Sequence, residues 1–318
     1  MRRRDFLLTV PAFVGLPALA QAPGKGARVS ILFNGDTNAP PPWLKVFEQQ
    51  LARHGFVAGK NLELRRVGEW GGSQERVTAA AREVVASRAD VIMVEGTGRA
   101  RIVASLTQAI PIVLAGAADP VGSGLVKDLA RPGGNVTGVS NQECELIRKR
   151  FELIRELLPG ARRAAIIASR AIPCKITKEA LLGADSPVDL LWVEAKGAGP
   201  NADLQAALRA NPDVIVPFGV SSVREAEAIR RTLDQRRVPI VSDDSWNEGA
   251  VISLIHDTDV IARSCADQVA RILAGARPGD LPVELVAKFE LVVNLRRAKE
   301  IGLQVPGSIL LRADRVIE

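Results

Sequence analysis

Short apolar segments of strand length alternate with segments of helical periodicity along nearly the whole of this chain. In the first part, the predicted strands are residues 29–33, 62–67, 90–94, 110–114 and 135–139. The predicted helices follow the prolines at 40–42, cover residues 73–87 and 99–108, and run from the Asp119-Pro120 turn to Ala130. Strands that alternate with helices form right-handed βαβ units, so the sequence predicts an α/β fold with parallel sheets.

The alternation continues beyond residue 140 without a low-complexity linker. The predicted strands there are residues 164–168, 188–194, 213–217, 239–242, 250–255 and 289–295. The predicted helices are residues 143–158, 202–210, 222–236, 260–273 and 296–302. A chain of 318 residues exceeds the ~100–200 residues usual for one domain. We therefore expect two α/β lobes joined by several crossing segments.

The first 20 residues have the pattern of an export signal. Residues 3–7, RRDFL, match the twin-arginine form, an apolar run follows to Leu16, and ALA at 18–20 supplies a small-residue cleavage site. The apolar run is shorter than the ~20 residues that span a bilayer. We expect cleavage after Ala20 and a periplasmic mature protein.

Charge and motif content exclude several classes of function. The net charge is +6, of which about +4 remains after the signal segment, and no block of basic residues with interleaved aromatics occurs. The two histidines, His54 and His256, have no metal-ligand or nucleophile spacing, and no Walker or Gly-x-Ser-x-Gly motif is present. We expect neither nucleic-acid binding nor an enzyme, and no metal or cofactor.

The three cysteines carry no CxxC motif. Each is interpreted as a small buried residue by default. A disulfide between Cys144 and Cys174 is left open.

In open α/β sheets, ligands bind beyond the carboxyl ends of the strands. That rule selects residues 34–38, 95–99, 115–119, 169–171, 218–222 and 243–246. The candidate ligand-binding residues in and beside these segments are Asp36, Thr37, Gly96, Thr97, Asp119, Phe218, Ser221, Ser222, Asp244 and Trp246.

Each candidate also has a purely structural interpretation. Gly96 and Thr97 suit a carboxylate at a helix start, or form a plain loop. The serines at 221–222 are either helix caps or ligand contacts, and residues 243–246 are either an ammonium site beside an aromatic ring or a capped short helix. Asp119 is first a turn residue, and Phe218 is more often core. Glu95 and Arg99 are unusual charges at this edge.

Four phrases resemble one known family when taken together and in order. They are DPVGSGLV at 119–126, LARPGGNVTG at 129–138, LPVE-x-x-x-KFELVVNL at 281–295 and LLRADRVIE at 310–318. They are similar to the periplasmic solute-binding component of ABC transporters, in the family related to tryptophan and tyrosine binders. The resemblance covers residues 28–318.

The resemblance implies a type I periplasmic binding protein with two Rossmann-like lobes and three crossing segments. The implied N-terminal lobe is residues 21–139 plus 256–287, and the C-terminal lobe is 140–255 plus 288–318. Such a protein closes on a small solute and docks, as a monomer, on an ABC transporter permease with its ATPase. The alternative is a sensor module that presents its bound state to a membrane signalling receptor.

The chain departs from this family at residues 251–257, VISLIHD, where relatives commonly have LMSYGPN, and it contains no tyrosine. These differences leave the aromatic ligand of such relatives open. We expect a small polar or amino-acid-like solute.

Overall fold

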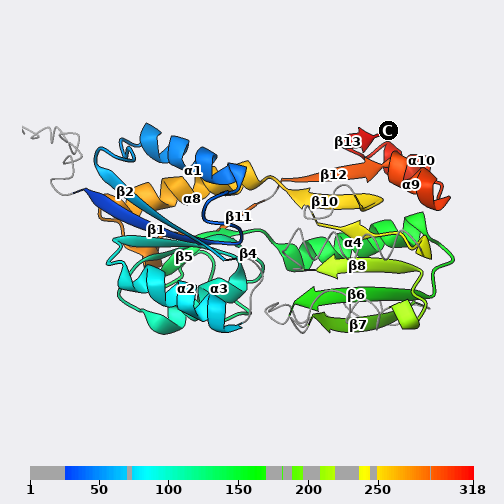
Figure 1. Cartoon of the computed structure of the whole chain (residues 1–318), viewed down its shortest axis with the longest axis horizontal. Helices are drawn as coiled ribbons and strands as arrows, with labels where there is room; N and C mark the ends of the chain where they lie inside the picture. The colour runs from blue at the N-terminus through cyan, green and yellow to red at the C-terminus, as the bar shows by residue number, and fades with distance from the viewer. Residues whose placement is uncertain are drawn as a thin grey trace, which may run out of the picture.

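The computed structural model shows two lobes side by side along the long axis of the molecule (Figure 1). It describes residues 26–69, 74–169, 181, 188–195, 208–218, 236–243, 249–286 and 288–318. The predicted signal segment, the first residue of the predicted helix 73–87, and most of the predicted helices 202–210 and 222–236 lie outside these residues. The predicted strands overlap the observed ones throughout the described part of the chain.

The N-terminal lobe is built on one parallel sheet, in the order β11-β5-β4-β3-β1-β2. Its strands are β1 (Ala27–Phe33), β2 (Leu62–Gly68), β3 (Val91–Glu95), β4 (Ile112–Ala117), β5 (Val136–Ser140) and β11 (Glu284–Leu285). Because successive side chains of a strand point to opposite faces, Ile31 and Leu32 of β1 belong to different hydrophobic clusters. Both faces of this sheet are therefore buried.

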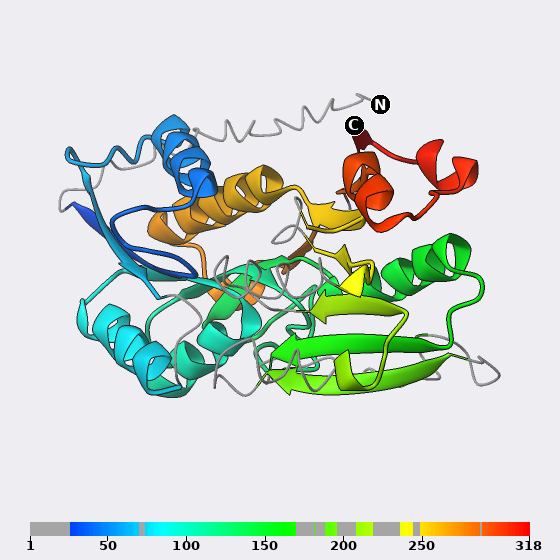
Figure 2. The same ribbon diagram turned by 45° about the vertical axis from the view of Figure 1, so that its right-hand side comes forward.

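Two pairs of helices cover the two faces. On one face lie α1 (Pro42–Arg53) and α8 (Thr258–Leu273), which are neighbours in space although distant in sequence (Figure 2). On the other lie α2 (Gln74–Ala86) and α3 (Thr97–Leu106). The helical spacing of Leu44, Phe47 and Leu51 is confirmed as a buried stripe, since all three are at most 1% exposed.

The short strand β11 was not predicted. It pairs with β5 in parallel, with Glu284 opposite Val139. The buried side chain of Gln268 on α8 holds it there by donating to the Gly138 carbonyl at 3.0 Å and to Glu284 Oε1 at 3.1 Å. A segment from late in the chain thus completes the sheet of the N-terminal lobe.

The C-terminal lobe contains a parallel group in the order β7-β6-β8 and a second group in the order β13-β12-β10-β9. A parallel bridge between Ile215 and Ile240 connects the two groups. The strands are β6 (Arg163–Ser169), β7 (Asp189–Ala195), β8 (Val214–Phe218), β9 (Val241–Ser242), β10 (Ile252–His256), β12 (Phe289–Asn294) and β13 (Arg315–Ile317). Only β10 and β12 pair antiparallel among them.

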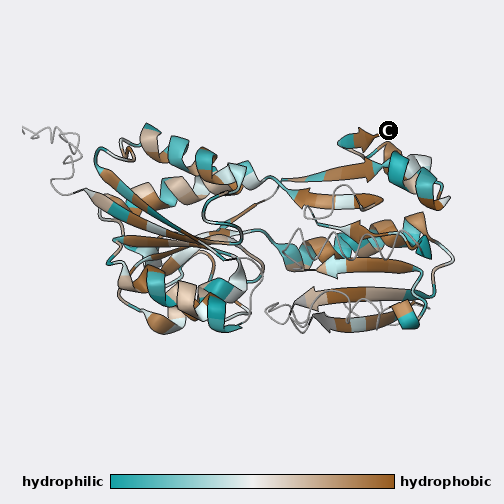
Figure 3. Cartoon of the chain, viewed as in Figure 1, coloured by the Kyte–Doolittle hydropathy of each residue, from teal (hydrophilic) through white to brown (hydrophobic). Residues whose placement is uncertain are grey.

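Helices α4 (Glu143–Leu157), α9 (Leu295–Ile301) and α10 (Gly307–Leu310) belong to this lobe. Buried residues of α4 and α9 share one hydrophobic cluster with β6, β8, β10 and β12. Figure 3 shows the strands of both lobes as predominantly hydrophobic.

The helix predicted to end at Ala130 is wrong, because residues 118–130 form turns. The Asp119 carboxylate accepts the Gly122 N–H at 2.7 Å, and the Pro120 carbonyl accepts the N–H groups of Leu125 and Val126. Side-chain capture of a backbone N–H competes with helix formation, and the glycines at 122 and 124 weaken a helix further.

Among the described elements, the chain passes between the lobes three times, between β5 and α4, between β10 and α8, and between β11 and β12. The first and third are tied together, since Val286 N–H donates to the Ser140 carbonyl at 3.0 Å and Gln142 Nε2 donates to the Val286 carbonyl at 2.8 Å. Gln142 itself has a left-handed backbone, with φ 52° and ψ 33°.

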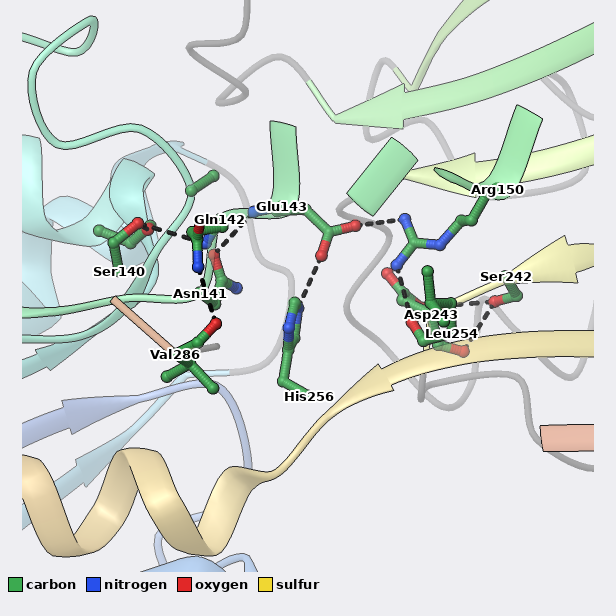
Figure 4. Close-up of polar contacts among 12 residues, drawn as sticks. Ser140, Asn141, Gln142, Glu143, Arg150, Ser242, Asp243, Leu254, His256 and Val286 are labelled. Carbon is green, nitrogen blue, oxygen red and sulfur yellow. Dashed lines mark hydrogen bonds and ion pairs between the residues drawn. The ribbon is translucent and has the colours of Figure 1, made fainter. Parts of the chain in front are cut away.

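The first and second segments meet through Glu143 (Figure 4). His256 Nε2 donates to Glu143 Oε2 at 2.7 Å, since an ionised carboxylate only accepts. The other oxygen of Glu143 binds Nη1 of Arg150, whose side chain is 0% exposed and whose Nη2 donates to the Leu254 carbonyl at 3.0 Å. Burial of the Glu143 carboxyl would by itself raise its pKa, but the Arg150 guanidinium and the His256 ring outweigh this and lower the pKa.

Cys144 and Cys265 have different states. Cys144, next to Glu143, is disulfide-bonded, whereas Cys265 on α8 is a buried free thiol. Burial, with a smaller effect from Glu284, raises the pKa of Cys265, so this thiol is inert. Cys174 lies outside the described residues.

Replacing Glu143 with Gln is expected to lower the free energy of unfolding at pH 7 by about 3–5 kcal/mol, because Arg150 is left buried without its counter-charge. The folded pKa of Glu143 lies below its ordinary value of 4.5, so the stability contributed by this charge is present above that value and is lost as pH falls through the folded pKa. Urea denaturation followed by circular dichroism should show the two proteins converging in acid.

The matched control is Glu145→Gln on the same helix, whose carboxylate is 60% exposed and 3.7 Å from Arg148. It should change stability by no more than about 0.5 kcal/mol. Equal losses in the two variants, or a difference that does not vary with pH, would contradict the role given to Glu143.

Candidate ligand-binding site

The carboxyl ends of β1, β3 and β4 lie on the edge of the N-terminal sheet that faces the C-terminal lobe (Figure 1). The residues that follow these strands begin with Asn34, Gly96 and Ala118, and Glu69 follows the neighbouring parallel strand β2 at the same end of the sheet. Their backbones are close together, since Gly96 N–H donates to the Ala115 carbonyl at 3.2 Å. We call this set of strand ends the interlobe edge.

Asp36 and Thr37 lie in the loop after β1, and the side chains of both accept hydrogen bonds from backbone N–H groups. The Asp36 carboxylate accepts the Asn38 N–H at 2.8 Å, and Thr37 Oγ1 accepts the Gly68 N–H at 2.8 Å. A Cβ at position 68 would lie 2.6 Å from the Gly35 carbonyl oxygen and from Thr37 N. The loop can therefore rest on the end of β2 only because residue 68 is glycine.

A pocket of about 360 Å³ adjoins this loop between the edge strand β2 and α2. Its lining residues are Thr37, Arg66, Val67, Gly68, Arg76, Ala79, Ala80 and Glu83. It lies to the side of the strand ends β3 and β4, so it is a neighbour of the candidate site rather than its centre.

Gly96 and Thr97 form the turn from β3 into α3. Gly96 has φ 78°, a conformation that glycine adopts without strain, and α3 begins at the next residue. The Thr97 side chain is buried, and its Oγ1 accepts the Ala118 N–H at 2.9 Å. Thr97 thus ties the end of β3 to the end of β4, and its hydroxyl keeps its proton and one lone pair.

The other predicted site residues have mixed outcomes. Asp119 serves the turn through Gly122, which was its structural interpretation. The side chain of Phe218 is fully buried in the main hydrophobic cluster of the C-terminal lobe, as in its structural interpretation, and its contact with a ligand stays a prediction. Ser221, Ser222, Asp244 and Trp246 lie outside the described residues, so their roles stay predictions.

Two residues at the interlobe edge were not predicted individually. Asn34 N–H donates to Glu95 Oε2 at 2.9 Å, and Asn34 Oδ1 accepts from Arg99 Nη2 at 2.7 Å. The carbonyl of Glu69 accepts from the same Nη2 at 2.9 Å. The available signal was position, since Asn34 directly follows β1 and Glu69 directly follows β2.

Arg99 is the cation at the centre of this group. Burial lowers the pKa of Arg99, and the nearby carboxylates of Glu95 and Glu69 oppose that change. The carboxylate of Glu69 also pairs with Arg76 at 3.4 Å. The edge thus combines one partly buried guanidinium with two carboxylates and suits a polar or charged small molecule.

Within the described residues, no group of three or more His, Cys, Asp or Glu side chains is arranged to hold a metal ion. None of the helices in this part of the chain has the length and apolar character needed to cross a bilayer.

Replacing Gly68 with Ala is expected to displace the loop that carries Asp36 and Thr37, because the new Cβ meets backbone atoms at 2.6 Å. The free energy of unfolding should fall by about 1–3 kcal/mol, the usual cost of overpacking. Thermal denaturation measures this change. Gly160→Ala is the control, since a Cβ there has no atom within 4 Å, and equal melting temperatures for the two variants would contradict the close approach.

Comparison with known proteins identifies a family and a relative that match most of this chain. The family model described as "ABC transporter substrate binding protein" matches residues 44–317. The "Tyrosine-binding protein" of Clostridioides difficile (strain R20291) is 26% identical over 270 residues, which are 82% of this chain and 76% of that protein.

Two solved structures share the arrangement of elements. A conserved domain protein from Vibrio cholerae O1 biovar eltor has a TM-score of 0.80 and 30% identity, with 92% of this chain and all of that chain (100%) covered. The ABC domain in complex with L-Trp from Streptococcus pneumonia has a TM-score of 0.78 and 24% identity over 92% of this chain and 100% of that one. The chain has the type I periplasmic binding protein fold and belongs to the ABC transporter substrate-binding protein family.

Proposed function

We propose that this protein captures a small polar or amino-acid-like solute between its lobes and delivers it to an ABC permease driven by an ATPase. The observation that carries the proposal is the interlobe edge, where Asn34, Thr97 and Arg99 gather at the ends of neighbouring strands. Relatives named as a tyrosine-binding protein and as a complex with L-Trp support an amino-acid-like solute.

The proposed lobes are residues 21–139 plus 256–287 and residues 140–255 plus 288–318. A solute that contacts both lobes stabilises the closed arrangement by its higher affinity for that state. Closure by rotation of rigid lobes needs a few residues that absorb backbone changes. Gln142 supports this mechanism, since its left-handed backbone lies in a connecting segment.

We further propose that the chain is exported. Replacing Arg3 and Arg4 with Lys is expected to block passage across the membrane, because the twin-arginine pair is the feature read by the export machinery. Fractionation of the native host should find the mature form, beginning at Gln21, in the periplasm. A full-length product that remains in the cytoplasm of the unaltered host would contradict export and delivery to a permease together.

A thermal-shift screen of amino acids, organic acids, purines and sugars tests the solute. A solute at 100 times its dissociation constant should add about 2.7 kcal/mol to the free energy of unfolding, because it binds only the folded protein. X-ray scattering with the same solute should show a smaller radius of gyration as the lobes close. If no small solute raises the melting temperature, or the radius is unchanged at saturation, the proposed function fails.

A further inference from the structure

We infer that Arg99 is a solute-contacting residue and that it selects solutes carrying a carboxylate group. The inference rests on the proposed function and deepens it by naming a chemical group of the solute and the residue that binds it. Arg99 lies in the first turn of α3, the helix that begins two residues after the end of β3 on the interlobe edge. Three lines of evidence support the assignment.

The guanidinium is held in place from one side. Nη2 donates to Asn34 Oδ1 at 2.7 Å and to the Glu69 carbonyl at 2.9 Å. These acceptors follow β1 and β2, so the side chain spans two strand ends and is partly buried. An exposed arginine on a helix would instead keep its rotamer freedom and would lose that entropy when it binds a solute. Arg99 is therefore preorganised, which reduces the entropy that a solute must overcome on binding.

The other two nitrogens of the guanidinium, Nε and Nη1, have N–H groups without acceptors among the described residues. Nε is buried and has no hydrogen-bond partner, and Nη1 makes no hydrogen bond with any described residue. Nη1 lies 3.9 Å from the position that a Cβ would take at Gly96, so this nitrogen lies beside the turn from β3 into α3. Buried donors without acceptors are uncommon in folded proteins. A carboxylate is the acceptor that matches the geometry of an arginine fork.

The charges around Arg99 narrow the class of solute. The carboxylates of Glu95 and Glu69 lie close enough to act on Arg99 electrostatically, and Glu95 is fixed to the Asn34 N–H at 2.9 Å. Because like charges repel at short range, these carboxylates disfavour a polyanion such as phosphate. A solute with a single carboxylate, with or without a cationic group elsewhere, fits this balance.

The test compares Arg99→Gln, Arg99→Lys and the control Arg101→Gln, which alters an exposed arginine on the same helix. The probes are the common L-amino acids and lactate, each measured beside its carboxamide by thermal shift and then by calorimetry. Each variant is compared with its own ligand-free melting temperature, which separates loss of binding from loss of stability.

The unaltered protein is expected to bind at least one carboxylate probe and to bind the matching carboxamide at least ~10-fold more weakly. Arg99→Gln should weaken the carboxylate probe at least ~10-fold, since a charge-assisted hydrogen bond is lost. The dissociation constant of Arg99→Lys should lie between those of the unaltered protein and Arg99→Gln, and that of Arg101→Gln should match the unaltered protein. If Arg99→Gln does not fold, Arg99→Lys decides, and an unchanged dissociation constant in it overturns the inference.

Two further outcomes separate this inference from the proposed function. A lower ligand-free melting temperature in Arg99→Gln with an unchanged dissociation constant would mean that Arg99 only ties strand ends together. Binding confined to sugars or other solutes without a carboxylate would also overturn the inference and leave the proposed function standing. Binding of no solute of any kind would overturn both.

Discussion

The buried charge cluster of Glu143, Arg150 and His256 is the constraint on which the joining of the two lobes depends. An arginine with no exposed side-chain surface requires a charged partner, and Glu143 at the first residue of α4 supplies it. The second oxygen of the same carboxylate accepts a hydrogen bond from Nε2 of His256, which lies at the end of β10. One side chain thereby fixes the position of two connecting segments, while Gln142 and Ser140 fix the third through Val286.

Residues that are fixed by hydrogen bonds and a residue with an unusual backbone conformation lie next to each other in the connecting segments. Glu143 and His256 fasten the connecting segments on the side of the C-terminal lobe, whereas the backbone of Gln142, one residue earlier, is in a conformation that non-glycine residues seldom adopt. Strained backbone conformations occur where the surrounding structure enforces them and are common at switch regions. The family departure at residues 251–257 acquires a physical meaning here, because His256 is the residue that Glu143 binds.

Periodicity in the sequence was sufficient for most of the elements but not for the contacts between distant residues. The stripe Leu44, Phe47 and Leu51 could be placed in the core because its spacing matches one face of a helix. The helix expected before Ala130 was wrong because a side-chain contact of Asp119 decides that turn, and periodicity does not report such contacts. The two residues of β11 escaped prediction because their partner, β5, lies far away in the sequence.

In the candidate site too, the sequence indicated the positions of residues but not their contacts. Thr37, Thr97 and Arg99 lie after β1 and β3, as their position in the sequence indicated, and their contact with a solute stays a prediction. The sequence could not show that Gly68 and Ala118 take the two threonine oxygens, since those N–H groups arrive on other strands. Nor could it show that Asn34, 65 residues before Arg99, would orient the guanidinium.

The return of α8 to the N-terminal lobe affects the order in which the lobe can fold during synthesis. Strands β1 to β5 leave the ribosome first, but Cys265 and Val269 of α8 cover the sheet face that contains Met93 and Val113. A nascent chain that has reached residue 257 therefore has only α1 on that apolar face and lacks the part that α8 covers. The lobe whose sequence starts first is completed only after most of the other lobe has been made, so its folding is coupled to near-completion of the chain rather than to its own synthesis.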